Sequence, residues 1–185
     1  MEKAAPLFNQ KGIAGTSISD IMEATRLAKG GIYGNFTGKE EISLAAFDHI
    51  VNIVAEEVRR LTSGESTARG KLNAILEFYR TYPTNPPMKG GCPVINFGTE
   101  ADDTNPLLRR RVNEVILQFQ QSIERLVQRG IRDGEFRQEW DARIFAIKMY
   151  AMMEGGIMIS RIQNSNRQMS LIIDLLQQEM AGWLT

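Results

Sequence analysis

The side chains of this sequence that could support covalent or metal chemistry are few. Cys92 is the only cysteine and His49 the only histidine. His49 lies in the middle of a helical pattern, and neither residue has neighbours spaced as a catalytic set or as metal ligands. The glycines of "AKGG" at 28–31 lack the remainder of a phosphate-binding loop. We therefore expect no enzymatic activity, no metal and no cofactor.

The composition leaves the partner open and favours a cytoplasmic protein. Lys and Arg total 22, as do Asp and Glu, so the net charge gives no sign of a nucleic-acid partner. A single cysteine cannot form an internal disulfide and suits a reducing compartment. The most apolar segment, 144–159, contains Lys148 and Glu154 and is shorter than the roughly 20 residues that span a membrane. We expect a cytoplasmic localisation and no membrane partner.

Apolar residues repeat with helical period over nearly the whole chain. Phe47, Ile50, Val54 and Val58, for example, recur at steps of three and four. Loops rich in proline and glycine, such as 82–91, separate such segments. No stretch of useful length alternates as a strand does. The expected fold class is all-α, with about nine helices.

The last two predicted helices, at about 142–163 and 168–183, are apolar on more than one face. In the final helix, Met169, Ile172 and Leu176 belong to one stripe, and Leu171 and Leu175 form a second. Helices of this kind must be covered on more than one side. Two interpretations remain open: burial within one subunit, or a homodimer interface about a two-fold axis.

Two helix starts lie close together near the N-terminus. Ser17 can cap one helix, with Asp20 three residues on, and Thr37 can cap another, with Glu40 three residues on. Between these caps, one short helix ends in a tight turn and a second covers about 29–35. Two short helices joined in this way describe a helix-turn-helix at about 17–36, whose second helix would enter a DNA major groove.

The segment "APLFNQKGIAGTSISDIMEATRLAKGGIYGNFTGKEEI" closely resembles the N-terminal domain of TetR-family transcriptional repressors. The residues that match the family pattern are Ala5, Leu7, Phe8, Gly12, Thr16, Ser17, Asp20, Ile21, Ala24, Lys29, Gly30, Ile32, Tyr33, Phe36, Lys39 and Glu40. The resemblance implies a helix-turn-helix DNA-binding domain over 1–46 and a larger ligand-binding and dimerisation domain over 47–185.

Several positions depart from the pattern or bear on how DNA is read. Ala28 stands where the family usually has a Ser or Thr cap, and Gly34 where a bulkier residue that often touches DNA is common. Pro6 does not suit a helix interior, so we expect the first helix to start late or to kink. Gly30 belongs to the pattern and would let DNA approach the backbone closely. Because Gly31 and Gly34 also lack side chains, we expect recognition to depend on DNA shape and phosphate positioning.

The resemblance and the helix-turn-helix geometry together indicate the DNA contacts. Hydroxyls of Thr16, Ser17 and Tyr33 can reach phosphate oxygens, and Lys39 adds positive charge. Lys29 suits guanine and Asn35 suits adenine. The predicted DNA-binding set is Thr16, Ser17, Ser19, Ala28, Lys29, Gly30, Gly31, Tyr33, Gly34, Asn35 and Lys39.

Three members of this set have another interpretation that the sequence leaves open. Tyr33 could be a core residue, Lys39 a solvated charge, and Asn35 a cap for the C-terminal end of its own helix.

The C-terminal region resembles a domain in which a small-molecule effector lowers operator affinity, which implies a coupling free energy between two sites. Methionines, several of them in one helix, suit an adaptable apolar cavity. Each candidate could instead be an ordinary core residue. The predicted ligand-binding set is Phe78, Tyr82, Met88, Cys92, Phe97, Phe119, Met149, Tyr150, Met153 and Met158.

The segment "GGCPVINFGTE" resembles a TetR subgroup in which Gly-Cys-Pro or Gly-Cys-Leu opens the sixth helix. Some of these relatives use the cysteine to sense electrophiles or oxidants. A cysteine at a helix N-terminus has a lowered pKa and more thiolate, which supports a reactive Cys92. The alternative is a small buried thiol that only packs.

The sequence therefore predicts a regulator that binds a palindromic double-stranded operator as a homodimer through its last two helices. A small-molecule inducer, with an electrophile or oxidant as one option, would release it. The alternative is a helical small-molecule-binding or interaction protein that does not bind an operator.

Overall fold

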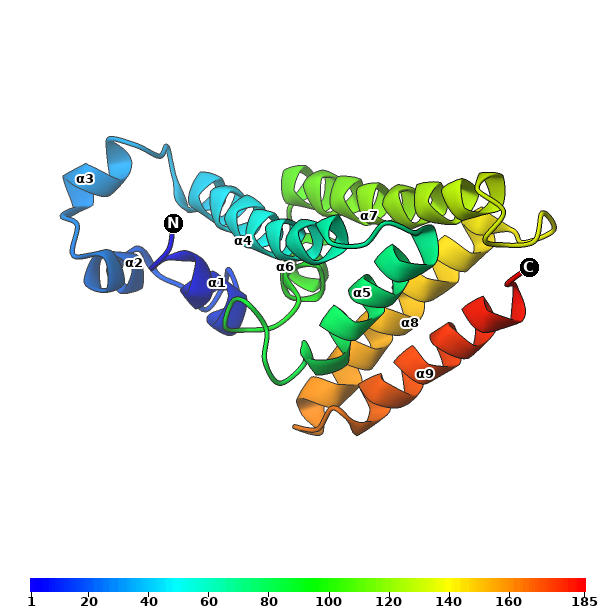
Figure 1. The fold of residues 1–185 in the computed structure, drawn as a ribbon. Helices are drawn as coiled ribbons and strands as arrows, with labels where there is room; N and C mark the ends of the chain where they lie inside the picture. The colour runs from blue at the N-terminus through cyan, green and yellow to red at the C-terminus, as the bar shows by residue number, and fades with distance from the viewer. The chain divides into compact units, whose positions relative to one another are not determined.

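The computed structural model describes residues 1–185 and contains nine helices (Figure 1). The all-α expectation is confirmed, since the only strand-like feature is an isolated bridge between Phe136 and Leu184. No helix combines the length and apolar character that crossing a membrane requires. The helices are α1 (Ala5–Lys11), α2 (Ile18–Thr25), α3 (Lys29–Tyr33), α4 (Lys39–Ser63), α5 (Ala68–Thr81), α6 (Pro93–Ala101), α7 (Pro106–Arg132), α8 (Ala142–Ile162) and α9 (Arg167–Gly182).

The chain forms two compact units. The first contains 1–54 and 87–113, and the second contains 55–86 and 114–185. The first unit thus joins α1–α3 and most of α4 to α6 and the start of α7. These units differ from the division at residue 46 that the sequence indicates, because α6 belongs to the same unit as the N-terminal helices. The sequence-based boundary remains a prediction.

Helix α1 begins late, as Pro6 led us to expect. The helix starts at Ala5, so Pro6 lies in its first turn, where a missing N–H leaves no hydrogen bond unmade. Phe8 of α1 is buried in the first unit. In the same unit, the rings of Phe47 and Phe97 pack with their centroids 5.4 Å apart, which joins α4 to α6.

The turn between α1 and α2 relies on side chains to pair its backbone groups. A carboxylate from α6, that of Glu100, accepts from the N–H groups of Ile13 and Ala14 at 2.8–2.9 Å. The Lys39 ammonium of α4 donates to the carbonyls of Ile13 and Thr16 at 2.8 and 3.2 Å. An anion and a cation from two different helices therefore fix one irregular loop.

A second polar cluster joins α1 to the loop before α6. The Asn9 side chain is 3% exposed, and its amide donates to the carbonyls of Lys89 and Gly91. Asn96 of α6 donates in turn to the Asn9 backbone and side-chain oxygens and to the Gly90 carbonyl, each at 2.9 Å. The side-chain amides of Asn9 and Asn96 thus have hydrogen-bond partners, which offset the free-energy cost of removing these groups from water.

The second unit is built on α8, which is apolar on most of its faces. Gly156 of α8 allows a close approach to α9, because a Cβ there would overlap Met169 and Ile172. At the other end, the Trp140 ring lies 4.6 Å from that of Phe145 and 4.8 Å from that of Phe136. These contacts close the loop between α7 and α8 against the core.

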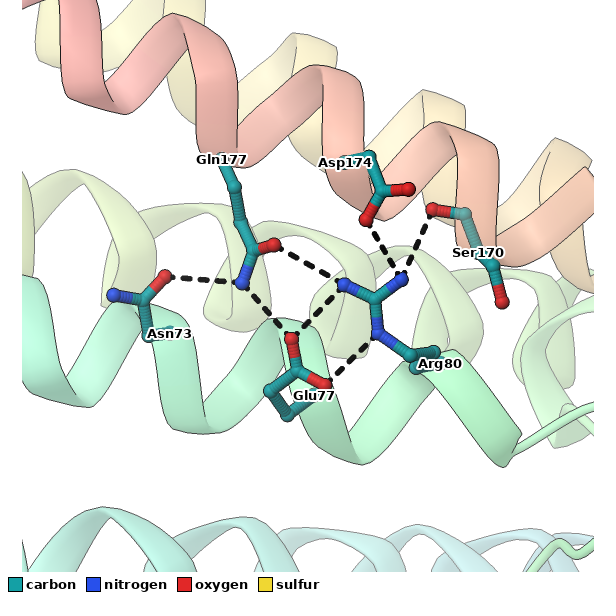
Figure 2. Close-up of polar contacts among 6 residues, drawn as sticks. All are labelled: Asn73, Glu77, Arg80, Ser170, Asp174 and Gln177. Atoms are coloured by element: carbon teal, nitrogen blue, oxygen red, sulfur yellow. Dashed lines mark hydrogen bonds and ion pairs between the residues drawn. The ribbon is translucent and has the colours of Figure 1, made fainter.

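Helix α9 is joined to α5 by a polar network centred on Arg80 (Figure 2). Its guanidinium donates to both carboxylate oxygens of Glu77, to Asp174 at 2.8 Å, to the Gln177 side chain and to the Ser170 carbonyl. The Glu77 carboxylate, followed by Asp174, raises the pKa of Arg80 further above its usual range. The planar guanidinium of arginine carries five N–H donors and can serve all of these acceptors, whereas a lysine ammonium carries only three.

We expect Arg80→Met to lower the free energy of unfolding by about 1–2 kcal/mol, because it removes the link between α5 and α9 while keeping the apolar stem. Urea denaturation followed by circular dichroism measures the change. Arg60→Met is the matched control, since Arg60 also pairs with a glutamate three residues earlier, Glu57, yet has no hydrogen bond or ion pair to another helix. Equal losses in the two variants would contradict a tertiary role for Arg80.

Glu100→Ala is expected to destabilise the protein by about 1–2 kcal/mol, because it leaves the N–H groups of Ile13 and Ala14 without their carboxylate partner. Asp103→Ala removes an exposed carboxylate close to Glu100 that accepts no side-chain or backbone hydrogen bond in the structure. Comparing the denaturation midpoints of the two variants checks the assignment. A midpoint for Glu100→Ala no lower than that of Asp103→Ala would show that the turn does not depend on Glu100.

Candidate nucleic-acid interface

Helices α2 and α3 form the predicted helix-turn-helix. Ser17 and Asp20 make the predicted capping box at the start of α2, with the Ser17 oxygen accepting from the Asp20 N–H. Hydrogen bonds from the Ser17 hydroxyl, the Ser17 N–H and Lys11 hold the pKa of Asp20 far below its usual range. The turn after α2 passes through Arg26, whose φ of 60° is left-handed. This residue sharply ends α2 and redirects the chain into α3.

Helix α3 is short and weakly capped. Its N-cap residue, Ala28, makes no side-chain hydrogen bond, as expected from the missing Ser or Thr. The helix ends at Tyr33, two residues earlier than the sequence indicates, because the exposed Asn35 side chain turns back to donate to the Gly31 carbonyl at 2.9 Å. Asn35 therefore caps the helix in this structure. Ile32 is 3% exposed and anchors α3 to the core.

The outward face of α3 carries little besides backbone. A Cβ added at Gly30 would meet no protein atom within 4 Å, and one at Gly31 would meet only Leu27 at van der Waals distance. The fold of the chain itself therefore does not require glycine at either position. Each glycine destabilises a helix by about 1 kcal/mol relative to alanine, and no contact within the chain offsets that cost at these two positions.

Tyr33 and Lys29 are exposed on α3. Tyr33 is 44% exposed, so it is not a core residue. The Lys29 ammonium lies 5.8 Å from the centre of the Tyr33 ring, within the range of a cation–π contact. Ser17 and Ser19 are exposed at the start of α2. These four side chains are accessible to a ligand outside the protein.

Two other predicted DNA contacts have internal roles in the structure. Thr16 is fully buried, and its hydroxyl donates to the Gly12 carbonyl at 2.7 Å. The ammonium of Lys39 is neither free nor fully solvated, because it holds the carbonyls of the turn before α2. At the start of α4, Thr37 donates from its N–H and hydroxyl to Glu41 and not to Glu40, the expected partner, and these bonds lower the pKa of Glu41.

Arg26 is a further candidate contact, outside the set predicted from the sequence. Arg26 is exposed in the turn between α2 and α3, and no carboxylate is paired with it. The sequence feature that could have identified Arg26 is its positive charge within the predicted turn of the helix-turn-helix. It gives the helix-turn-helix a further positive charge beside Lys29.

The predicted ligand-binding residues divide between the two units. Met88, Cys92 and Phe97 belong to the first, and the others belong to the second. Within the second unit, the Phe78 and Tyr82 rings are 5.5 Å apart, and the Phe119 and Tyr150 rings are also 5.5 Å apart. Tyr79, which the sequence analysis did not select, connects the two pairs at 5.2 Å from Tyr82 and 6.1 Å from Phe119.

The methionines of α8 have different environments. Met149 and Met153 are buried, whereas Met158 is 47% exposed. Cys92 is 6% exposed and stands at the N-cap of α6, directly before Pro93. No group of three or more His, Cys, Asp or Glu side chains is arranged to hold a metal ion.

Comparison with known proteins shows the same family over both regions of the chain. Residues 1–46 match the family described as bacterial regulatory proteins, tetR family, and residues 68–176 match the tetracyclin repressor-like C-terminal domain. A TetR transcriptional regulator from Chloroflexus aurantiacus is 42% identical, with a TM-score of 0.94 over 99% of this chain and 92% of that one. A TetR-family regulator from Cytophaga hutchinsonii is 34% identical, with a TM-score of 0.92 over 100% of this chain and 92% of that one.

More distant similarities preserve the fold. A cysteine mutant of the TetR-family regulator CifR, in complex with double-stranded operator DNA, has a TM-score of 0.83 at 17% identity over 97% of this chain and 93% of that one. The matches at both ends of the chain, together with the two close structures, lead to one conclusion. This chain belongs to the tetR family of helix-turn-helix transcriptional regulators.

Proposed function

We propose that this regulator is a repressor that binds a near-palindromic operator as a homodimer and is released by a small molecule. The observation that carries the proposal is the bare outward face of α3, where Gly30 and Gly31 leave room for a partner to reach the backbone. The operator complex of CifR supports DNA as that partner. The alternative is a helical ligand-binding protein of the same fold without an operator.

The accessible side chains favour contacts to phosphates over contacts to bases. Ser19 and Tyr33 present hydroxyls, and Lys29 and Arg26 present charge, whereas the Ser17 hydroxyl would first have to leave its bond to Asp20. Asn35 has its amide engaged by Gly31, so a base contact would require it to leave that bond. With so few donors aimed at base edges, we infer that sequence preference comes mainly from the shape and deformability of the operator.

The dimer interface is proposed on the exposed apolar side chains of the last two helices. On α8, Ile144 is 59% exposed and Ile162 is 79% exposed. On α9, Leu171 is 59% exposed and Leu175 is 49% exposed. A two-fold axis would pair these exposed apolar side chains with those of a second copy and remove them from water.

The effector site is proposed at the aromatic cluster of α5, α7 and α8, formed by Phe78, Tyr79, Tyr82, Phe119 and Tyr150. Edge-to-face rings with polar hydroxyls suit an apolar or aromatic ligand with one or two hydrogen-bonding groups. Binding there would alter the packing of α5 against α7, which is the coupling that an induced release from DNA requires.

A second candidate for the inducer is an electrophile or oxidant that reacts with Cys92, as in the Gly-Cys-Pro or Gly-Cys-Leu subgroup. Cys92 occupies the N-cap of α6, the position that the sequence resemblance assigns to a sensing cysteine. Because Cys92 is only 6% exposed, a reagent would reach the thiol only after a local opening of the structure. If N-ethylmaleimide released operator DNA equally from the wild type and from Cys92→Ser, this candidate would be excluded.

The operator proposal is tested by gel shift on the protein's own upstream DNA, with Gly31→Ala as the decisive variant. We expect Gly31→Ala to raise the stability of the free protein by up to about 1 kcal/mol and to lower DNA affinity by about tenfold or more, because the new methyl group blocks close approach. Gly182→Ala in α9, where a Cβ would meet nothing within 4 Å, is the control. Unchanged or tighter DNA binding by Gly31→Ala would argue against backbone approach at α3.

The dimer proposal is tested by Leu171→Glu. A carboxylate on each copy would face its own symmetry mate or an apolar surface, so we expect monomers in size-exclusion chromatography with light scattering, at unchanged helix content. Leu107→Glu is the matched control, because Leu107 is 58% exposed near the start of α7. A Leu171→Glu protein that stays dimeric would move the interface away from α9.

A further inference from the structure

A groove in the second unit collects positive charge in a chain whose net charge is zero. It lies between the last turns of α4, the first half of α5 and the C-terminal half of α7, and its volume is about 460 Å³. Its charged lining residues are Arg59, Lys71, Arg125, Arg129 and Arg132. The lining contains no aspartate or glutamate.

Little inside the protein neutralises these charges. Only Arg129 has an ion-pair partner, the exposed Asp133 at 3.2 Å. Two carboxylates lie at the start of α5. That of Glu135 is engaged by the N–H groups of Ala68 and Arg69 at 2.8 and 2.9 Å, and that of Glu65 lies beside Gly70 without an ion-pair partner. The cluster therefore has positive potential that an external anion would satisfy.

Helix dipoles account for only part of the cluster. Arg129 and Arg132 lie in the last turn of α7, where cations interact favourably with the dipole. Arg125 lies well inside α7, and Lys71 lies in the first turns of α5, where a cation is disfavoured. These two residues need an explanation outside their own helices.

The floor of the groove is apolar. Val58 of α4, Ile75 of α5 and Leu126 of α7 line it. The two hydroxyls in the lining are committed as donors, Thr62 to the Val58 carbonyl and Ser122 to the Phe119 carbonyl. The hydrogen-bond donors that remain for a ligand are therefore the cationic groups, which line the groove together with the apolar side chains.

We propose that this groove binds a small amphipathic anion, with its carboxylate, phosphate or sulfonate group at Arg125 and Arg129 and its apolar body on Val58, Ile75 and Leu126. The volume is that of a small-molecule site, and guanidinium groups suit the planar or tetrahedral oxygens of such anions. The site is separate from the aromatic cluster and does not depend on operator binding. A larger polyanion is the occupant that the test below must exclude.

The test uses the full chain and two fluorescent probes of nearly equal apolar body. Anilinonaphthalene sulfonate carries an anionic group, and N-phenylnaphthylamine does not. We expect one groove-bound sulfonate probe per chain, with an affinity that falls as salt rises. Arg125→Gln combined with Arg129→Gln should weaken the sulfonate probe by about tenfold or more and leave the neutral probe unchanged.

The control changes two arginines of the same helix outside the groove, Arg109→Gln with Arg110→Gln, and should leave both probes unaffected. Three results would overturn the proposal. The sulfonate probe could bind the groove variant as tightly as it binds the wild type. The control variant could lose as much affinity for the sulfonate probe as the groove variant does. Alternatively, heparin could bind through Arg125 and Arg129 while the sulfonate probe does not, which would assign the surface to a macromolecule.

Discussion

The pairing of the backbone between α1 and α2 is the constraint on which the DNA-facing region depends. This turn has no helix or sheet of its own to pair its N–H and carbonyl groups. Glu100 of α6 takes the N–H groups, and Lys39 of α4 takes the carbonyls. Because the turn directly precedes Ser17, the start of α2 is placed by side chains from two later helices. The orientation of α3 follows from that placement, so the reading helix is positioned by tertiary contacts more than by its own stability.

Local signals in the sequence predicted the parts of this fold that local physics controls. Ser17 and Asp20 predicted the start of α2, and Ala28 predicted that α3 lacks a side-chain cap. Pro6 predicted the late start of α1. Each of these depends on residues within one helical turn. Apolar periodicity likewise predicted nine helices, because it reflects burial along each element.

The parts that could not be predicted depend on contacts between distant residues. Lys39 stays a predicted phosphate contact, but the sequence did not reveal that its ammonium also donates to carbonyls more than twenty residues earlier in the chain. From the sequence, the Thr16 hydroxyl was expected to be accessible to a phosphate, yet the packing of the turn buries it. The basic groove combines three helices, and no single segment of the sequence is strongly basic enough to reveal it. Side-chain function at these positions is set by tertiary geometry, which a spacing pattern does not contain.

The Arg80 network has a consequence for how such a regulator would respond to its own concentration. Arg80 and Glu77 lie on α5, beside Phe78 and Tyr82, while their partners lie on α9, the helix that also carries Leu171 and Leu175. Under the proposed effector site and dimer interface, ligand occupancy near α5 and subunit association through α9 would share one set of bonds and be thermodynamically linked. Dilution of the protein would change its apparent affinity for the effector. The inducer dose needed in a cell would accordingly vary with how much of the regulator that cell contains.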